Sequence, residues 1–342
     1  MSVEGLQRRY GIAIADLARL AGVSSMSVSR AINGKPGVGD ETRRRILRLA
    51  EEQGFTINGT ARALKTGRSM TLGVISLSTT LHGPTAAWFG VEHAARARGY
   101  AVSVVTLDSL DEASLTKAMG DLSRVPVEAV VIISPLRTDA AALRSIEGTV
   151  PVVAIWAPSE AGVSFAAMDH VSAARAATEH LLELGHATVH HISGPTAWTG
   201  TEQRIAGWRQ ALTAAGAREP RIHEGDWSAA SGARAMRAIL ESNEAITALF
   251  VANDQMALGA MSVCHEHGIR IPEQISVIGY DDVPDSEFYS PPLTTVRQNF
   301  DLIAERAVAK VMAAIEGTKP PADELVSLPM IIRASTGPAP TR

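Results

Sequence analysis

The 342-residue chain lacks several features on which whole classes of protein depend. It has a single cysteine, Cys264, so no disulfide can form within the chain, which suits a reducing compartment. No apolar stretch is long enough to cross a membrane, and the segment before Gly11 carries charges where a signal peptide would be apolar. We therefore expect a cytoplasmic protein that neither enters a membrane nor is exported.

The sequence signatures of common enzymes are also missing. The segment 73–83 reads GVISLSTTLHG and has no glycine-rich phosphate loop, and neither G-x-S-x-G nor H-E-x-x-H occurs in the chain. The histidine clusters His190–His191 and His265–His267 fall in a predicted strand and at a predicted helix end, where zinc binding is not favoured. We expect no catalysis, no cofactor and no metal site.

Charge is distributed unevenly along the chain. Residues 1–68 hold 12 Lys and Arg against 6 Asp and Glu, whereas the remaining residues hold 20 against 30. A basic head on an acidic body is typical of a nucleic-acid-binding domain joined to a domain that binds a neutral ligand. Chance variation of charge along a chain is the alternative. Assigning a nucleic-acid-binding domain therefore also requires a sequence motif in the basic head.

The spacing of residues in the basic head predicts a helix-turn-helix. The apolar positions that would share one small core are Leu17, Ala21, Val23 and Val28. Gly22 falls in the turn, where a positive φ costs a glycine little, and Ser24 can cap a second helix over Ser25–Ile32. A third helix is expected over Asp40–Gln53, with Ile46, Leu49 and Ala50 inward and Arg43, Arg44, Arg45 and Arg48 outward. A plain helical hairpin is the alternative.

In a helix-turn-helix the first residues of the second helix reach base edges in the major groove. The residues in this position are Ser25, Met26, Ser27, Ser29 and Arg30. Arg30 is suited to two parallel hydrogen bonds with guanine, whereas Met26 offers only an apolar contact. Ser24, Lys35 and Thr42 are expected to contact phosphates, which position the protein without reading sequence.

The runs AGVSSMSVSRAING, VGDETRRRILRLAEEQGF and NGTARALKTGRS resemble the head of the lactose-repressor (LacI/GalR) family. The resemblance implies a DNA-binding domain over 1–57 and a hinge over 58–69, in which Leu64 enters the minor groove at the operator centre and kinks the duplex. It adds Asn33 and Ala61 to the expected DNA contacts, and it implies a homodimer on a near-palindromic operator. From the residues alone, the hinge would be interpreted as a simple linker.

From Met70 onward, short apolar runs alternate with amphipathic stretches, which predicts an α/β core of doubly wound parallel sheets. The predicted strands are Thr71–Ile75, Val102–Leu107, Ala129–Ile133, Val152–Ile155, Val189–Ile192, Ala248–Val251 and Ser276–Ile278. The predicted helices include Pro84–Arg98, Val171–Leu184, Arg204–Ala215 and Gln255–His267. Ligands of such folds bind at the carboxyl ends of the strands.

The stretches EGDWSAASG, FVANDQMALGAM, ISVIGYDDVPDS and PPLTTVRQNF resemble the effector-binding core of the same family. The resemblance implies a two-lobed, periplasmic-binding-protein-like core over 70–342, with one lobe at about 70–168 and 300–325 and the other at about 169–298 and 327–337. It implies that the sugar is bound by Arg204, Trp227, Asn253, Asp281 and Phe300. Trp156 also falls in the implied cleft, where the family member that this core most resembles has an aspartate, so the pocket differs at this point.

These residue types suit a sugar. Aspartate accepts and arginine donates paired, charge-assisted hydrogen bonds to neighbouring hydroxyls, and a flat indole covers the C–H face of a pyranose. We predict a repressor of carbohydrate-utilisation genes that a sugar, in the first instance a galactoside-like one, releases from its operator. An ion pair for Arg204 and a core role for Trp227 are the alternatives, as are a sugar-processing enzyme and a sugar-binding protein with no role on DNA. The chain ends without a heptad-repeat tail, so a dimer is expected.

Overall fold

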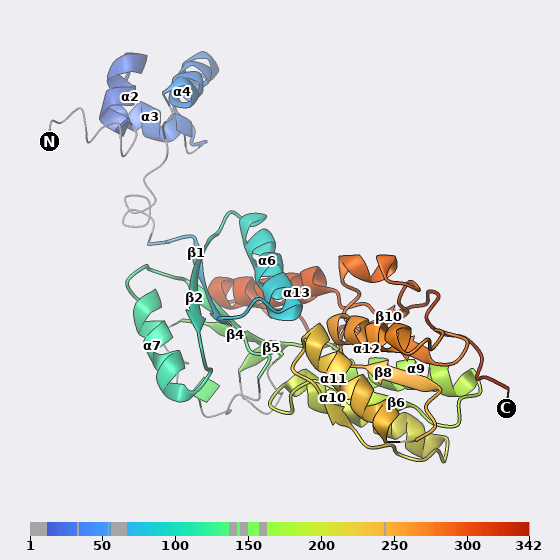
Figure 1. Cartoon of the computed structure of the whole chain (residues 1–342). Coiled ribbons are helices and arrows are strands. Elements are labelled where there is room, and N and C mark those ends of the chain that lie inside the picture. The colour runs from blue at the N-terminus through green and yellow to red at the C-terminus, as the bar shows by residue number, and fades with distance from the viewer. Residues whose placement is uncertain are drawn as a thin grey trace, which may run out of the picture. The chain divides into compact units, whose positions relative to one another are not determined.

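The computed structural model describes residues 12–32, 34–53, 55, 67–136, 142–143, 150–156, 163–242 and 244–341. The chain divides into two compact units, Met1–Ser69 and Met70–Arg342 (Figure 1). The described part of the first unit is helical, whereas the second alternates strands with helices. The predicted class, an all-α head followed by an α/β core, is therefore confirmed. Asn33 and the predicted hinge, with Ala61 and Leu64, lie outside the described residues.

The first unit is a helix-turn-helix made of α2 (Ile14–Ala21) and α3 (Ser25–Ile32), followed by α4 (Asp40–Glu52). Gly22 ends α2 in the left-handed conformation, with a φ of 61°. The Ser24 hydroxyl accepts a hydrogen bond from the Ser27 amide at 3.1 Å, which satisfies one of the free N–H groups at the start of α3. The predicted turn and cap are therefore both present.

A small apolar core holds these helices together. Its buried residues are Leu17, Ala18, Ala21, Val28, Ala31 and Ile46. Val23, Leu49 and Ala50, which were also predicted to face inward, are only partly buried. Three short helices cannot fully enclose a core, so the residues at its margin keep some contact with water.

The first lobe of the second unit has a parallel sheet in the order β2-β1-β3-β4-β5. Its strands are β1 (Thr71–Leu77), β2 (Ala101–Leu107), β3 (Ala129–Ile133), β4 (Val152–Ile155) and β5 (Ser164–Ala166). Helices α6 (His82–Arg96) and α13 (Phe300–Glu316) pack together against one face, and α7 (Glu112–Leu122) packs against the other (Figure 1). The sheet is therefore doubly wound, as predicted.

Strand β2 differs from the others because its residues alternate between exposed and half-buried. The sequence predicted buried strands throughout, but β2 lies at the edge of the sheet and pairs only with β1. An edge strand has a neighbour on one side only, so its apolar residues are less well covered.

The second lobe repeats this arrangement with the strand order β7-β6-β8-β9. Its strands are β6 (His190–Ser193), β7 (His223–Glu224), β8 (Ala248–Val251) and β9 (Ser276–Ile278). Its helices are α9 (His170–Glu183), α10 (Thr199–Ala214), α11 (Ala229–Glu241) and α12 (Asp254–Glu266), and the short 3-10 helix η2 (Pro284–Phe288) follows β9. Helices α9 and α10 pack together, as do α11 and α12.

The chain returns to each lobe after leaving it. An antiparallel pair of short strands, β10 (Thr295–Val296) and β11 (Met330–Ile331), flanks α13 on either side in the sequence. Beyond β11, the Ser335 carbonyl accepts a hydrogen bond from Val277 in β9 at 2.8 Å. Each lobe is therefore completed by segments from the last fifth of the chain.

Most element boundaries agree with the sequence predictions to within two residues, but α10 begins at Thr199 rather than Arg204. The residue before it, Trp198, makes no side-chain capping bond, so the sequence offers no capping signal at this end. Because the helix begins earlier than predicted, its first turn, including Gly200, borders a ligand-sized cavity.

Candidate functional site

A cavity of about 310 Å³ lies in the second unit, bordered by residues of both lobes. Pockets of this size are typical of small-ligand sites. Of the six residues predicted to bind the effector, five line it: Trp156, Arg204, Trp227, Asn253 and Asp281. The sixth, Phe300, does not line the cavity. Its ring packs edge-on behind Trp156 and His82, at centroid distances of 6.2 and 5.4 Å, so it supports this wall without facing the cavity.

Arg204 and Asp281 bring a donor and an acceptor together at the cavity wall. Both are more than nine-tenths buried, and Arg204 Nη2 lies 3.9 Å from Asp281 Oδ1. Arg204 Nη1 donates to the Ala252 carbonyl at 2.5 Å, and its guanidinium lies over the Tyr280 ring, 3.9 Å from the ring centroid. The two predicted alternatives for Arg204, an ion pair and a place in the ligand cavity, are therefore compatible.

Burial controls the electrostatics of this pair. It raises the pKa of Asp281, and the charges of Arg204 and His82 and a hydrogen bond from Gln298 oppose this rise. Charge-assisted hydrogen bonds from ligand hydroxyls would stabilise the carboxylate further. The site is therefore suited to a ligand that donates hydrogen bonds to a carboxylate.

Residues with a left-handed backbone gather at this cavity. The non-glycine residues with positive φ in the described part of the chain are Met70, Trp156, Trp227, Asp281 and Asp282. Three of them line the cavity, and Asp282 directly follows one of the three. Such conformations cost on the order of 1–3 kcal/mol each and persist where surrounding contacts hold them, often at functional sites.

Trp227 is held between two features of the second lobe. Its indole lies so close to Gly194 that a Cβ on that residue would be 2.1 Å from the ring. On another side, the Trp198 ring meets it at a centroid distance of 5.3 Å and an angle of 70°. The predicted alternative of a core role is partly correct, because Trp227 is 8% exposed and packs in the core cluster while still lining the cavity.

Asn253 also has a structural role, which the sequence did not predict. Its Oδ1 accepts a hydrogen bond from the Met256 amide at 2.9 Å and so caps α12. Its Nδ2 donates to the Trp227 carbonyl at 3.1 Å and to Gln255 Oε1 at 2.9 Å, which uses both of its protons. Asn253 therefore holds Trp227 in place, and only its oxygen retains capacity to accept a bond from a ligand.

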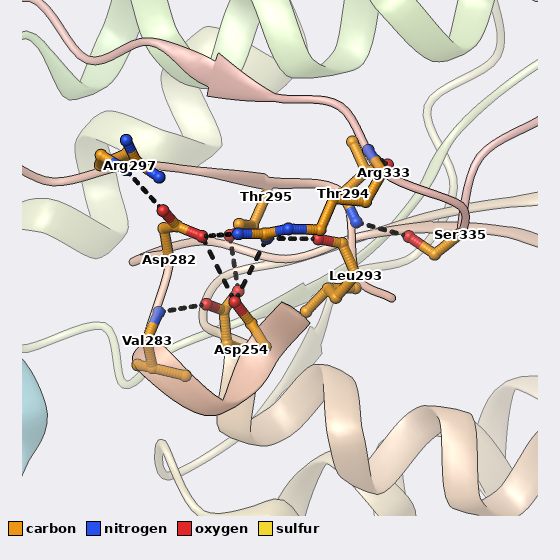
Figure 2. Close-up of polar contacts among 10 residues, drawn as sticks. Asp254, Asp282, Val283, Leu293, Thr294, Thr295, Arg297, Arg333 and Ser335 are labelled. Atoms are coloured by element: carbon orange, nitrogen blue, oxygen red, sulfur yellow. Dashed lines mark hydrogen bonds and ion pairs between the residues drawn. The ribbon is translucent and has the colours of Figure 1, made fainter. Parts of the chain in front are cut away.

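A buried carboxyl group, that of Asp254, binds the backbone of the turn that follows β9 at Val283 (Figure 2). Asp254 Oδ2 accepts from the Val283 amide at 2.9 Å, and Oδ1 accepts from the Thr295 hydroxyl at 2.6 Å. Burial, reinforced by the nearby Asp281 charge, raises the pKa of Asp254 to about 8. Asp254 therefore links the turn after β9 to the segment that leads to the first lobe.

The neighbouring Asp282 is fixed by two arginines (Figure 2). Its carboxylate accepts from Arg297 Nε at 2.5 Å and from Arg333 Nη2 at 2.6 Å. Burial alone would raise the pKa of Asp282, but these hydrogen bonds and charges outweigh it, so the pKa lies below its usual value. The two supporting carboxyl groups therefore differ, one favouring the protonated form and the other firmly ionised.

The raised pKa of Asp254 predicts a pH dependence of stability. The unfolded carboxyl group releases its proton near pH 4, whereas the folded one keeps it to about pH 8. The folded state therefore binds more protons between these values, and the free energy of unfolding falls as pH rises, by at most ~1.4 kcal/mol per pH unit. Chemical denaturation at several pH values should show this fall in the wild type and a smaller one in Asp254→Asn. Equal pH slopes in the two proteins would contradict it.

Several residues of the cavity were not predicted from the sequence. They include His82 and Pro84 at the start of α6, Trp198 and Gly200 at the start of α10, and Gln298. Gln298 lies two residues before Phe300 and donates to Asp281. The sequence therefore indicated the right motif, RQNF, but the residue of this motif that lines the cavity is Gln298 rather than Phe300. His170 also lines the cavity, and its Nδ1 shares a 2.8 Å hydrogen bond with the Tyr280 hydroxyl.

The helix-turn-helix exposes most of the residues predicted to read DNA. Ser25, Met26 and Arg30 at α3 are exposed, whereas Val28 on the opposite side is buried. The Arg30 side chain lies beside Gly37, where a Cβ would come within 3.0 Å of its Nη1. Lys35 is held by its backbone, because its carbonyl accepts from Arg43 at 2.6 Å. The exposed face of α3 therefore combines a hydroxyl group, a basic side chain and the apolar Met26.

The titratable side chains of the described residues outside the cavity form no metal site. No group of three or more His, Cys, Asp and Glu side chains is placed to hold a metal ion. His191 lies inside β6, stacks on Phe250 at 4.8 Å and has its pKa lowered to about 4 by burial. Among the helices described, none is both long and apolar enough to span a bilayer.

Comparison with known proteins matches both units. Residues 13–58 match the family model described as bacterial regulatory proteins, lacI family, and residues 178–336 match a periplasmic binding protein-like domain. The lactose operon repressor of Escherichia coli strain K12 is 32% identical over 95% of this chain and 91% of its own length. A lac repressor dimer bound to operator and the anti-inducer ONPF superposes with a TM-score of 0.86 at 32% identity, covering 96% of this chain and 99% of that one. A complex of the regulator CelR with cellobiose gives a TM-score of 0.70 at 29% identity, covering 95% and 99%.

Proposed function

This chain belongs to the lacI family of bacterial regulatory proteins and is a DNA-binding transcriptional repressor controlled by a small-molecule effector, and we propose that its effector is a sugar. The preferred sugar is galactoside-like, and its binding releases the repressor from the operator of carbohydrate-utilisation genes. The relatives reported above are regulators, and we propose that this chain likewise acts without catalysis.

One observation carries the sugar proposal. Arg204 and Asp281 present a donor and an acceptor 3.9 Å apart at a cavity wall, and the Trp227 indole lines the same wall. A pyranose combines neighbouring hydroxyls with an apolar C–H face, so it matches both parts of this wall. The relatives support the same class, since cellobiose is bound in the CelR complex.

The experiment is a panel of sugars and glycosides tested by calorimetry and for loss of operator binding. A sugar that binds the wild type, but not a variant of Arg204, and that weakens operator binding supports the proposal. Binding of a purine base in its place, with no sugar bound, would contradict it. A sugar that strengthens operator binding would identify the site correctly but reverse the proposed sign of regulation.

For the DNA side, we propose that α3 reads bases in each half of a near-palindromic operator bound by a homodimer. The base-reading residues are Ser25, Met26, Ser27, Ser29 and Arg30, with Ser24, Lys35 and Thr42 on phosphates. Asn33, Ala61 and Leu64 complete the proposed contacts. The lac repressor that superposes on this chain is itself a dimer bound to operator, which supports this arrangement.

Replacing Arg30 with alanine should weaken specific operator binding by ~1–3 kcal/mol and relax the preference for one base pair in each half-site. Arg30→Ala removes two hydrogen bonds to a base edge, so the loss depends on sequence. Arg44→Ala, on the exposed side of α4, is the matched control, because losing a phosphate contact weakens all sequences alike and reduces the salt dependence. Binding-site selection with both variants measures the difference. The same preferred base at every position for Arg30→Ala would contradict the base-reading role.

A further inference from the structure

The two walls of the cavity differ in chemistry. The second lobe supplies most of its charged and amide groups: Arg204, Asn253, Gln255, Asp281 and Gln298. The first lobe supplies mainly apolar groups, namely Leu81, Pro84, Pro135 and the ring of Trp156, and its polar groups are the side chains of Thr80 and His82 and the indole N–H of Trp156. A ligand that fills the cavity therefore meets both hydrogen-bonding groups and the apolar side chains of Trp198, Trp227 and Leu258 on the second-lobe side, and a mainly apolar surface on the first-lobe side.

Trp156 is fixed before any ligand arrives. Its amide donates to the Ala166 carbonyl at 3.0 Å, and its backbone is left-handed, with a φ of 68°. The edge of its ring contacts Phe300 at an interplanar angle of 89°. Its Cη2 lies 3.9 Å from the place where a Cβ on Gly83 would be, so the ring packs beside this glycine at about van der Waals distance. A ring held in this way loses little conformational entropy when a ligand packs against it.

We propose that Trp156 determines specificity by packing against the second ring of a two-ring glycoside, whose first ring is held by Arg204 and Asp281. This inference rests on the proposed function, because it concerns the same cavity and names the class of sugar. The second ring presents a flat apolar face, which either an aromatic aglycone or the C–H face of another pyranose can provide. A single sugar ring satisfies the second-lobe wall but leaves the first-lobe wall in contact with water.

The apolar character of the first-lobe wall carries this assignment. A free monosaccharide has hydroxyl groups around its whole rim, so turning one edge toward Leu81, Pro84 and the face of the Trp156 ring would leave hydroxyls there without partners. A second ring replaces that edge with a glycosidic bond and a flat surface, whose burial against an indole is favourable. The cavity volume of about 310 Å³ lies at the lower end of the range typical of pockets for small organic ligands, ~300–1,000 Å³.

The test measures how much a second ring adds to affinity. Calorimetry compares the methyl glycosides of galactose and glucose with the phenyl glycosides and with the disaccharides lactose and cellobiose. In the wild type, one of the two-ring ligands should bind ~30-fold more tightly than its methyl glycoside, which corresponds to burying one ring face. In Trp156→Gly, which accepts the left-handed backbone without strain, that gain should fall below ~3-fold, while affinity for the methyl glycoside changes by less than ~3-fold. Trp156→Phe should restore most of the gain.

Phe288→Ala is the matched control, because Phe288 is 78% exposed and does not border the cavity. It should leave the affinity gained from the second ring unchanged.

Phenyl glycosides and disaccharides distinguish an aromatic from a sugar second ring. An equal gain in the wild type and Trp156→Gly, or an equal loss of methyl glycoside and two-ring ligand, overturns the role of Trp156. Failure of every glycoside to bind the wild type overturns the proposed function itself, whereas methyl glycoside binding with no second-ring gain overturns only this inference.

Discussion

Asp281→Ala is expected to bind operator DNA with wild-type affinity and to lose at least ~100-fold in effector affinity, since each lost hydrogen bond to a charged group costs ~1.5–3 kcal/mol. The substitution removes the acceptor of the Arg204 pair and leaves a buried guanidinium without its counter-charge. It changes no residue of the helix-turn-helix, so repression should become insensitive to sugar. Calorimetry with the sugar and a gel-shift titration with operator DNA measure the two affinities separately.

Two further variants make this result interpretable. Asp281→Asn keeps the side-chain shape and tolerates the φ of 112° better than alanine, so it separates the loss of charge from backbone strain. Asp285→Ala removes an exposed carboxylate four residues away and should behave as the wild type. By linkage, operator DNA must weaken sugar binding to the wild type by the same factor as sugar weakens DNA binding. Normal release of operator by sugar in both Asp281 variants would mean that the cavity is not the effector site.

Gly194→Ala should lower effector affinity by ~30-fold or more, through the loss of an ordered aromatic contact area. A methyl group at this position would be 2.1 Å from the Trp227 ring, and the ring cannot retreat freely because Trp198 lies against it. The expected response is a displaced indole and a free energy of unfolding lower by ~1–3 kcal/mol, as for other overpacked cores.

The control for this prediction is Gly120→Ala in α7. A Cβ at Gly120 meets no atom within 4 Å, so the substitution should leave sugar affinity unchanged and, in a helix, should stabilise slightly. Trp227→Ala supplies a second comparison, because it removes the same wall without any clash. Wild-type sugar affinity in Gly194→Ala, with Trp227→Ala strongly impaired, would show that the indole has room to move and that Gly194 is not required.

The helix-turn-helix was predictable from sequence because its signals are local. Gly22 and Ser24 act within a few residues of their own positions, through a left-handed turn and a hydroxyl cap. The α/β alternation was equally accessible, since buried parallel strands such as β3 are continuous apolar runs. The exposure of β2 could not be predicted from the sequence, because it depends on which strand lies at the edge of the sheet.

Several contacts in the cavity could not be predicted from local sequence patterns. Resemblance identified Arg204 and Asp281, but no sequence pattern indicates that Asn253 uses its amide protons on Trp227 and Gln255. Gln298 was missed because its contact with Asp281 depends on a parallel pairing between residues 281 and 297. The left-handed backbone of Trp156 is equally invisible, since tryptophan carries no preference for that conformation. These features arise from packing between distant segments.

The position of α13 in the sequence has a consequence for synthesis on the ribosome. The strands of the first lobe are complete by Ala166, but α13, which covers the β3–β5 part of the sheet face that it shares with α6, begins at Phe300. The second lobe is complete only when Ser335 has been synthesised and its carbonyl can accept the hydrogen bond from Val277 in β9. Neither lobe can therefore be completed before nearly the whole chain has emerged, and the part of the apolar sheet face that α13 covers stays exposed for most of translation. Domains that complete so late are prone to aggregation, so yield on expression should depend on chaperone supply and on growth temperature.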